Sequence, residues 1–389
     1  MTRREPPLAS HLRGFGTTIF AEMTALAVET GAINLGQGFP DTDPPPEVAE
    51  AAMAAIRDGH NQYPPGPGIL PLREAIAEHQ ERFYGLHVDP SSEVLVTTGA
   101  TEAIASAMIS LLDPGDEVVM FEPYFDSYAA TVAMAGGVRR VVPLTLDGGE
   151  WVFDPDEFRA AVTPRTKLLL INTPHNPTGK VLTLAESELI AEIAIANDLL
   201  VVTDEVYEHL ACDAPHILLA TLPGMAERTL TISSGGKTFQ CTGWKIGWIT
   251  GPASLVTAVR TSKQFLTYVS GGPLQHGIAV GLRLGDDYFD DLRAGLRQRR
   301  DDLASGLAGA GLPSPPAQGG YFLTTDLRDI GADDAMDFCL DLPKRAGLVA
   351  IPSSVFYDHP ERGRSYVRWA FCKRPDVIDA AVQALQRLR

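Results

Sequence analysis

The sequence predicts an α/β protein in which a large unit built on a mostly parallel β-sheet precedes a smaller α+β unit. Between residues 93 and 234, short apolar runs alternate with segments of helical pattern. Strands that are apolar throughout are typical of a parallel sheet covered by helices on both faces. Beyond Pro273 the strand patterns are fewer and farther apart, which indicates an α+β arrangement. A chain of 389 residues has room for about two domains.

The helices are predicted from their start and stop signals. The segment 46–59 begins with Pro46 and ends with Gly59, residues that favour the first turn and the end of a helix. The segment that follows, "NQYPPGPGILP", is rich in Pro and Gly and predicts a loop. Helices are expected at 17–30, 46–59, 72–84, 100–112, 128–135, 185–198, 335–344 and 376–388.

The strands and the domain boundaries follow from the same pattern. Strands are expected at 93–99, 117–123, 138–144, 166–174, 199–207, 228–234, 319–327 and 365–373. After Pro273 a long helix carries leucines on one face, at 292, 296, 303 and 307. We expect an N-terminal arm, a large domain, an interdomain helix and a small domain, at 1–45, 46–275, 276–310 and 311–389.

Composition excludes several classes of function. The net charge of −17 argues against a nucleic-acid or anionic-membrane surface, since both need clustered Lys and Arg. No apolar run is long enough to span a membrane, and the N-terminus lacks the apolar core of a signal peptide. The cysteines form no C-x-x-C pair and the histidines no H-E-x-x-H motif, so we expect no disulfide framework, no metal and a cytoplasmic location.

In an open parallel sheet, ligands bind at the carboxyl ends of the strands, so the residues that follow each strand are candidates. Gly99, Ala100 and Thr101 open a helix after the first strand, where free N–H groups could hold a phosphate. The alternative is an ordinary glycine turn with a threonine cap. Phe125 follows the next strand and could stack on a planar ring, although most phenylalanines simply pack in a core.

Two further strand ends carry polar groups. Asn176 lies between two prolines in "TPHNPTGK", where a rigid loop would fix its amide toward a ligand; it could equally bond its own backbone. Asp204 and Glu205 end a buried strand, and Tyr207 follows. A buried carboxylate needs a partner, and a protonated ring nitrogen would serve. A metal pair, a Walker-B acid and a surface acid at a helix start are the alternatives.

A lysine and an arginine complete the candidates. Lys237 follows Ser234 and two glycines, directly after a strand. Gly236-Lys237-Thr238 matches the end of a P-loop, but the first glycine of that motif would fall on Thr231, so nucleotide binding is the weaker interpretation. Arg368, within a β pattern, could clamp a substrate carboxylate or face solvent.

Together these residues supply what a pyridoxal phosphate enzyme needs: a phosphate seat, a stacking ring, an amide, a carboxylate, a tyrosine and an imine-forming lysine. The segments "LGQGFPD", "NQYPPGPG", "NTPHNPTG", "TDEVYEHL" and "SSGGKTFQCTGWKIGW" also resemble those of class I/II aminotransferases of fold type I, over most of the chain. The resemblance is greatest to the kynurenine/glutamine/methionine aminotransferase branch and, within it, to actinobacterial N-succinyldiaminopimelate aminotransferase-like enzymes. It implies a large domain with a seven-stranded type of sheet.

The resemblance implies a role for each candidate. Lys237 would bond to the cofactor aldehyde and move the proton at the substrate Cα, while Asp204 would pair with the ring nitrogen. Asn176 and Tyr207 would bond the phenolic oxygen and Phe125 would stack on the ring. The phosphate would be held by Gly99, Ala100, Thr101, Ser234, Lys245 and, from a partner subunit, Tyr63. Many relatives have arginine where Lys245 stands. Arg368 would grip the substrate carboxylate, with Asn176 and Gly38 beside it.

The implied enzyme is a homodimeric, pyridoxal-phosphate-dependent aminotransferase with shared active sites. It would move an amino group between an L-amino acid and a 2-oxo acid in two half-reactions. A cysteine-conjugate β-lyase using the same site is the nearest alternative. A P-loop NTP-binding protein and a non-catalytic binding protein are more distant ones.

Overall fold

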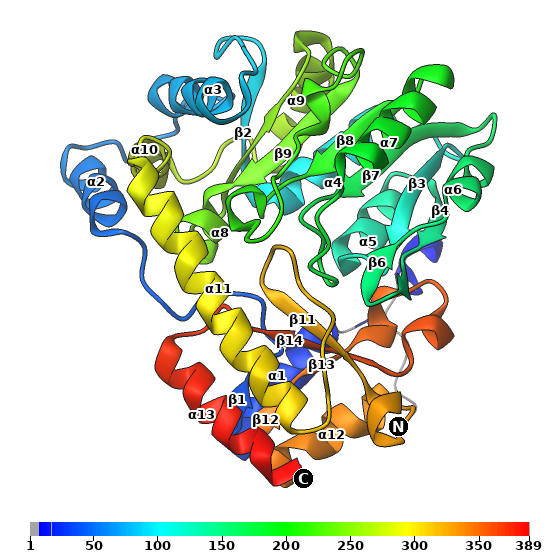
Figure 1. Cartoon of the computed structure of the whole chain (residues 1–389). Coiled ribbons are helices and arrows are strands. Elements are labelled where there is room, and N and C mark those ends of the chain that lie inside the picture. The colour runs from blue at the N-terminus through cyan, green and yellow to red at the C-terminus, as the bar shows by residue number, and fades with distance from the viewer. Residues whose placement is uncertain (1–7, 17, 389) are drawn as a thin grey trace, which may run out of the picture.

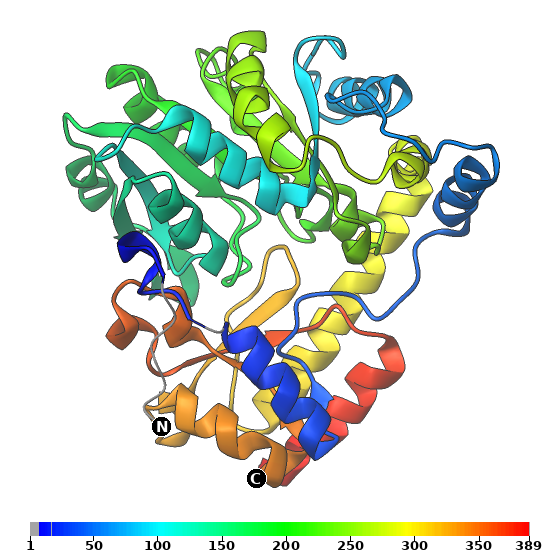
Figure 2. The ribbon, with the colours of Figure 1, turned by 180° about the vertical axis from the view of Figure 1, so that it is seen from behind.

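The computed structural model describes residues 8–16 and 18–388, so Thr17, the first residue of the first predicted helix, lies outside them. The chain forms a large unit around a seven-stranded sheet and a smaller unit around a three-stranded sheet (Figures 1 and 2). The long helix α11, Asp286–Gly309, runs from one unit to the other. The α/β fold class is thereby confirmed, whereas the boundaries at 45, 275 and 310 stay predictions.

The large sheet has the strand order β2-β10-β9-β8-β7-β3-β4. Only β10 runs antiparallel to its neighbours, β2 and β9. The strand bounds are Val94–Thr98 (β2), Glu117–Glu122 (β3), Val138–Pro143 (β4), Thr166–Asn172 (β7), Leu200–Asp204 (β8), Thr229–Ser234 (β9) and Ile246–Thr250 (β10). The strands β2, β3, β7, β8 and β9 are buried over nearly their whole length. Strands β3, β7 and β8 accordingly contain continuous apolar runs, whereas β9, TLTISS, alternates Thr with apolar residues.

Strand β10 was not predicted. It starts directly after Lys245, a non-glycine residue with a left-handed φ of 55°. Gly247 lies where a Cβ would come within 2.6 Å of the Gly99 carbonyl carbon, so this strand needs a glycine that interrupts its β pattern. An antiparallel strand also needs no crossover helix, so the alternation of strands and helices that revealed the other strands is missing here.

Helices cover both faces of the large sheet. Gly99–Leu111 (α4), Asp126–Met134 (α5) and Ala253–Leu266 (α9) pack on one face, seen in front in Figure 2. Pro155–Ala161 (α6) and Leu184–Ala196 (α7) pack on the other. Pro46–Arg57 (α2), Leu70–Tyr84 (α3) and Gly272–Gly281 (α10) lie beside the β2 end of the sheet.

The smaller unit packs its helices on a sheet of order β11-β14-β13. Its elements are Ile19–Thr30 (α1), Phe322–Asp326 (β11), Ala335–Ala346 (α12), Ile351–Pro352 (β13), Tyr366–Ala370 (β14) and Pro375–Leu385 (α13). A parallel pair, Ile33–Asn34 (β1) and Leu348–Val349 (β12), ties the N-terminal segment to this unit. The four leucines predicted to share a face of α11 are buried in its core. A separate hairpin joins Thr145–Asp147 (β5) and Glu150–Val152 (β6).

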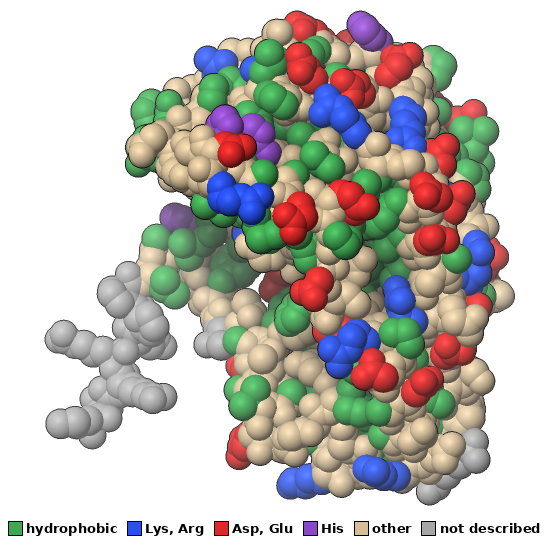
Figure 3. Space-filling model, turned by 90° about the vertical axis from the view of Figure 1, so that its left-hand side faces the viewer, with side chains coloured by type: hydrophobic (Ala, Val, Ile, Leu, Met, Phe, Trp, Pro, Cys, Tyr) green, Lys and Arg blue, Asp and Glu red, His purple; other side chains and the backbone are tan. Residues whose placement is uncertain are grey.

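The surface agrees with an acidic chain of mixed charge. On the face shown in Figure 3, acidic and basic side chains are interspersed among hydrophobic ones, and the surface is hollowed between the two units. Within residues 8–16 and 18–388, no helix combines the length and the apolar character that crossing a membrane requires.

Candidate active site

Most of the predicted site residues line one cavity of about 380 Å³ between the two units. The large sheet contributes strand ends and the turns after them, and the smaller unit contributes β11 and β14. The predicted residues on its wall are Gly38, Gly99, Ala100, Thr101, Phe125, Asn176, Asp204, Tyr207, Ser234, Lys237, Lys245 and Arg368. The carboxyl edge of the sheet therefore brings together groups that are far apart in the sequence.

Lys237 lies in the four-residue helix α8, Gly235–Thr238, which follows β9 without a break. A Cβ at Gly236 would lie 3.0 Å from the Thr242 Cα, so a glycine lets the two segments approach. The Lys237 Nζ donates a 2.9 Å hydrogen bond to the carbonyl of Gly38. Burial lowers the pKa of Lys237 to about 8, despite the opposing effects of Cys372 and Asp204. A substantial fraction of this amine is therefore neutral near physiological pH.

Asp204 ends β8, beside Asn172 at the end of β7. It is buried, and its carboxylate accepts hydrogen bonds from the Tyr128 hydroxyl at 2.5 Å and the Val206 N–H at 3.4 Å. Among the described residues no Lys, Arg or His forms an ion pair with it. Burial raises its pKa to about 6. A buried carboxylate without an ion-pair partner calls for a cationic ligand.

The neighbouring Glu205 does not share this site. Its side chain is fully buried away from the cavity wall and lies 2.5 Å from His216 Nε2. The two acids therefore do not form the metal pair that the sequence left open, because successive residues at the end of a strand point to opposite faces of the sheet.

The first turn of α4 offers an anion seat. Gly99 opens the helix with a φ of +72°, and Thr98, the N-cap, provides no side-chain cap. The backbone N–H groups of this turn are therefore open to a ligand on the cavity side. Lys245 faces the same turn, since a Cβ at Gly99 would lie 3.5 Å from its Nζ.

Arg368 is buried, with its side chain in an aromatic cage. Its Cζ lies 4.0, 4.9 and 5.1 Å from the ring centroids of Phe322, Phe356 and Phe20. Nη1 donates to the Asn176 Oδ1 at 3.0 Å and Nη2 to the Gly36 carbonyl at 2.8 Å. Burial lowers its pKa to about 10, so the guanidinium stays charged at neutral pH. The solvent-facing alternative for Arg368 is therefore wrong.

The remaining predicted side chains form the walls. The Tyr207 ring packs edge-on against Tyr321 and Phe322, and its centroid lies 5.6 Å from the Lys237 Nζ. Phe125 is partly buried and contacts Tyr128 edge-to-face at 5.8 Å. Gly38 lines the cavity beside Lys237, while the carbonyl next to Arg368 belongs to Gly36.

Tyr63 is the predicted residue that lies outside this cavity. Its side chain is 84% exposed and meets Tyr268 edge-on at 5.8 Å. The buried Lys263 holds the surrounding loops together, because its Nζ donates to the carbonyls of Gly66 and Tyr268. Within one chain, Tyr63 does not reach the other predicted residues.

The sequence interpretation missed several residues of the site. Tyr128 carried a usable signal: a hydroxyl on the buried face of a short helix must find a polar partner. Phe20, Gln37 and Phe322 carried none, because each reaches the cavity through contacts between segments distant in the sequence.

A second buried cluster lies between α3 and the 3-10 turn Glu208–Leu210, which follows β8. The Nε2 atoms of His79 and His209 are 2.6 Å apart, and Glu208 accepts hydrogen bonds from Tyr84 and Ser233 at 2.6 and 2.5 Å. The H-E-x-x-H search could not find these histidines, which come from different elements. Both carboxylate oxygens of Glu208 already accept hydrogen bonds, whereas the buried His79 Nδ1 has no partner in the described part of the chain.

Comparisons with known proteins identify the family. Residues 30–385 match the family model "Aminotransferase class I and II". The chain is 53% identical to the "Probable N-succinyldiaminopimelate aminotransferase DapC" of Mycobacterium tuberculosis, covering 97% of this chain and 98% of that protein. It is 38% identical to the methionine aminotransferase of Escherichia coli, covering 97% and 98%.

The fold agrees with this assignment. The structure of N-succinyldiaminopimelate aminotransferase from Mycobacterium tuberculosis matches with a TM-score of 0.96 at 53% identity, covering 98% of this chain and 100% of that one. The family explains a lysine after a buried strand without the rest of a P-loop. The chain therefore belongs to the class I and II aminotransferases and is a pyridoxal-phosphate-dependent transaminase that acts on amino acids and oxo acids.

Proposed function

We propose that Lys237 is the residue that binds pyridoxal phosphate covalently and that moves the proton at the substrate Cα. The support is its burial beside Asp204 and its pKa of about 8, which lets the Nζ accept and release a proton near neutral pH. When bound, the cofactor supplies an aldehyde and a ring that withdraws electrons from the substrate Cα. The Gly38 carbonyl holds the Nζ in position through its 2.9 Å hydrogen bond.

Asp204 holds the ring nitrogen in its protonated form. The site fits this role because the buried carboxylate forms no ion pair among the described residues and Tyr128 orients it. A charge-assisted hydrogen bond to a cationic ring would relieve the cost of burying the charge. Asn176 and Tyr207 bond the phenolic oxygen of the ring, and Phe125 stacks on its face.

The phosphate is bound at the start of α4 by the residues Gly99, Ala100 and Thr101, with Ser234 and Lys245. The uncapped helix terminus supplies N–H donors and the positive end of its dipole, and Lys245 supplies a full charge. A lysine here provides charge without the fork geometry of an arginine.

Arg368 grips the substrate carboxylate, with Asn176 and the segment at Gly38 beside it. Its Nε has no hydrogen-bond partner in the described part of the chain, so donor capacity remains for a ligand. The phenylalanine cage keeps the guanidinium dry and oriented, which strengthens a charge-assisted bond.

The enzyme works as a homodimer in which Tyr63 of one subunit completes the phosphate site of the other. The Tyr63 and Tyr268 rings support this, because they are exposed and in contact with each other, and contiguous exposed apolar side chains mark interaction surfaces. Mixing Lys237→Ala and Tyr63→Ala subunits tests it. Hybrid dimers would regain one intact site each, whereas a site built within one subunit would stay inactive.

N-succinyldiaminopimelate is the proposed amino donor. The observation that supports it is the 53% identity, over nearly the full chain, to a relative described by that activity. A methionine-like apolar amino acid is the second candidate, because the described cations on the cavity wall are Lys237, Lys245 and Arg368, and Phe20, Phe39 and Phe322 line the rest of the substrate side.

A donor panel decides between them. The purified enzyme is mixed with each amino acid and the change from the aldehyde to the amine form of the cofactor is followed by absorbance. We expect N-succinyldiaminopimelate to give the highest kcat/KM, with no change in Lys237→Ala. Methionine as the best donor would support the second candidate. Pyruvate and ammonia released from a cysteine conjugate without an oxo acid would instead indicate a β-lyase.

A further inference from the structure

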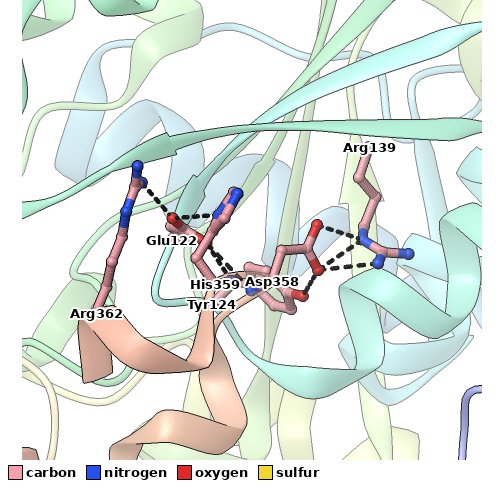
Figure 4. A network of polar contacts seen from close by, with 6 residues as sticks. All are labelled: Glu122, Tyr124, Arg139, Asp358, His359 and Arg362. Atoms are coloured by element: carbon pink, nitrogen blue, oxygen red, sulfur yellow. Dashed lines mark hydrogen bonds and ion pairs between the residues drawn. The ribbon is translucent and has the colours of Figure 1, made fainter. Parts of the chain in front are cut away.

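A polar network joins the two units beside the cavity (Figure 4). We name it the Glu122–Asp358 clamp, formed by Glu122, Tyr124, Arg139, Asp358, His359 and Arg362. Glu122 ends β3 and Arg139 lies on β4, whereas the last three residues follow the 3-10 turn Ser353–Phe356 of the smaller unit. Figure 4 shows this segment turned toward the strand ends, with the acids between the cations.

Glu122 anchors the segment through its carboxylate, which binds both side chains and backbone N–H groups of the segment. The carboxylate is fully buried and accepts from Arg362 Nη1 at 2.6 Å. It also accepts from the N–H groups of Asp358 and His359 at 3.1 and 3.3 Å, and His359 Nδ1 lies 3.0 Å away. A shift of the segment away from this carboxylate would leave several buried donors without an acceptor, so the segment has little freedom to move.

Asp358 forms the second half of the clamp. Arg139 binds it with Nη2 at 2.9 Å and Nε at 3.2 Å, and the Tyr124 hydroxyl donates to the same carboxylate. The backbone is joined as well, since the Tyr124 N–H donates to the Phe356 carbonyl at 2.8 Å. Both side chains of the Arg139–Asp358 pair are about three-quarters shielded from solvent, at 27% and 24% exposed.

Each side of the clamp ends at the proposed substrate site. Tyr124 precedes Phe125, which lines the cavity. Phe356, on the other side, is the ring of the cage that lies 4.9 Å from the Arg368 Cζ. The clamp therefore joins a wall of the cofactor cavity to the cage around the guanidinium.

We propose that the Glu122–Asp358 clamp positions the carboxylate grip, by holding Phe356 against Arg368 while fixing Phe125 on the cavity wall. The residues of the clamp touch neither substrate nor cofactor and act through these two rings. This inference rests on the proposed role of Arg368.

The test uses the holoenzyme with Asp358→Asn and the milder Tyr124→Phe, which removes a single hydroxyl. Glu78→Gln is the matched control, because it breaks another two-point carboxylate–arginine pair, with Arg283 Nε and Nη2 at 2.6 and 2.9 Å, away from the cavity. For Asp358→Asn we expect the KM of the amino donor to rise about tenfold, with kcat within about threefold of the parent. Tyr124→Phe changes KM in the same direction, and Glu78→Gln leaves it unchanged.

A general loss of structure would not be selective for the carboxylate. The variants are therefore also assayed with an amine that matches the donor but lacks the carboxylate on its Cα. In a second experiment, Asp358→Asn is combined with Arg368→Lys. The clamp predicts that the preference for amino acid over amine falls in Asp358→Asn, and that Asp358→Asn has less than about a twofold further effect once Arg368 is lysine.

The outcomes separate this inference from the proposed function. If Arg368→Lys leaves KM unchanged, the proposed grip itself is wrong. If Arg368→Lys raises KM but both clamp variants keep the parent's KM and preference, the grip stands and the clamp inference is overturned. Equal losses with amino acid and amine would also overturn it.

Discussion

Lys237 and Arg368 are both buried cations, yet their surroundings give them opposite chemistry. Burial lowers the pKa of each by a similar amount, to about 8 for Lys237 and about 10 for Arg368. An ammonium starts from a lower pKa, so the same shift brings it into the physiological range, while the guanidinium remains charged. The large sheet thus presents a cation that can lose its proton, and the smaller sheet presents one that keeps it.

The neighbours of the two cations fit this division. Lys237 contacts one carbonyl and lies near a carboxylate that forms no ion pair among the described residues. Arg368 is held at two nitrogens and by three rings. A proton-transfer group needs freedom to move between partners, whereas a grip needs fixed geometry.

The largest expected effect comes from removing the titrating cation. Lys237→Ala should lower kcat by about 10³-fold or more, because both the covalent attachment and the proton transfer depend on its Nζ. Lys237→Arg, which keeps a charge that cannot be lost near neutral pH, should be as inactive. Stopped-flow measurement of the first half-reaction checks this, and an active Lys237→Arg enzyme would contradict the role.

The fixed cation should matter less. Arg368→Lys should lower kcat/KM for the amino donor by about 10- to 100-fold, mainly through KM, because one two-point hydrogen bond to a charged group is lost. Steady-state kinetics with varied donor measures it. Arg283→Lys, at an exposed pair with Glu78, is the control and should retain the parent's KM. A fall confined to kcat would contradict the proposal that Arg368 binds the substrate carboxylate.

The pH dependence of the free energy of unfolding distinguishes the two cations, because they lose their protons at different pH values. In the apoprotein, the native Lys237 loses its proton near pH 8, while the unfolded chain keeps it to about 10.5. The unfolded state therefore binds more protons in this window, and stability rises with pH. Between pH 8 and about 9.5 we expect the free energy of unfolding to increase by roughly 2 kcal/mol more in the parent than in Lys237→Met.

The matching substitution of Arg368 should not remove this pH-dependent gain in stability. Arg368→Met should keep most of the parent's slope between pH 8 and about 9.5, because the guanidinium titrates only from about 10 upward and burial, not Arg368, is the main cause of the lowered pKa of Lys237. Urea unfolding at several pH values measures both slopes. Equal slopes in parent and Lys237→Met would contradict a lowered pKa of Lys237.

Tyr128→Phe should give the smallest change. The lost hydroxyl donates to Asp204 and lowers its pKa, so its removal should raise that pKa above about 6. Cofactor affinity should fall about threefold to tenfold, and more below pH 7 than above it, as Asp204 becomes protonated. Fluorescence titration of apoprotein with cofactor tests this. Tyr288→Phe is the control, because it also removes one hydroxyl, which in the parent donates to the Thr238 carbonyl.

The sequence predicted best what depends on chain order alone. Asp204 ends the buried strand β8 and Lys237 follows the buried strand β9, and the ends of parallel strands share one edge of the sheet. Strand β10 escaped because it pairs antiparallel and carries Gly247 where the backbone passes α4. The cage of Arg368 escaped because Phe20 and Phe356 reach it from opposite ends of the chain. Such contacts are set by tertiary packing, which local patterns do not encode.

Reduction of the holoenzyme with borohydride, followed by peptide mass spectrometry, tests the central claim most directly. The account predicts a single phosphopyridoxyl-modified lysine, Lys237, in the segment that joins β9 to η4, Thr242–Trp244. Modification of Lys245 or another lysine instead, with Lys237 recovered unmodified, would contradict it.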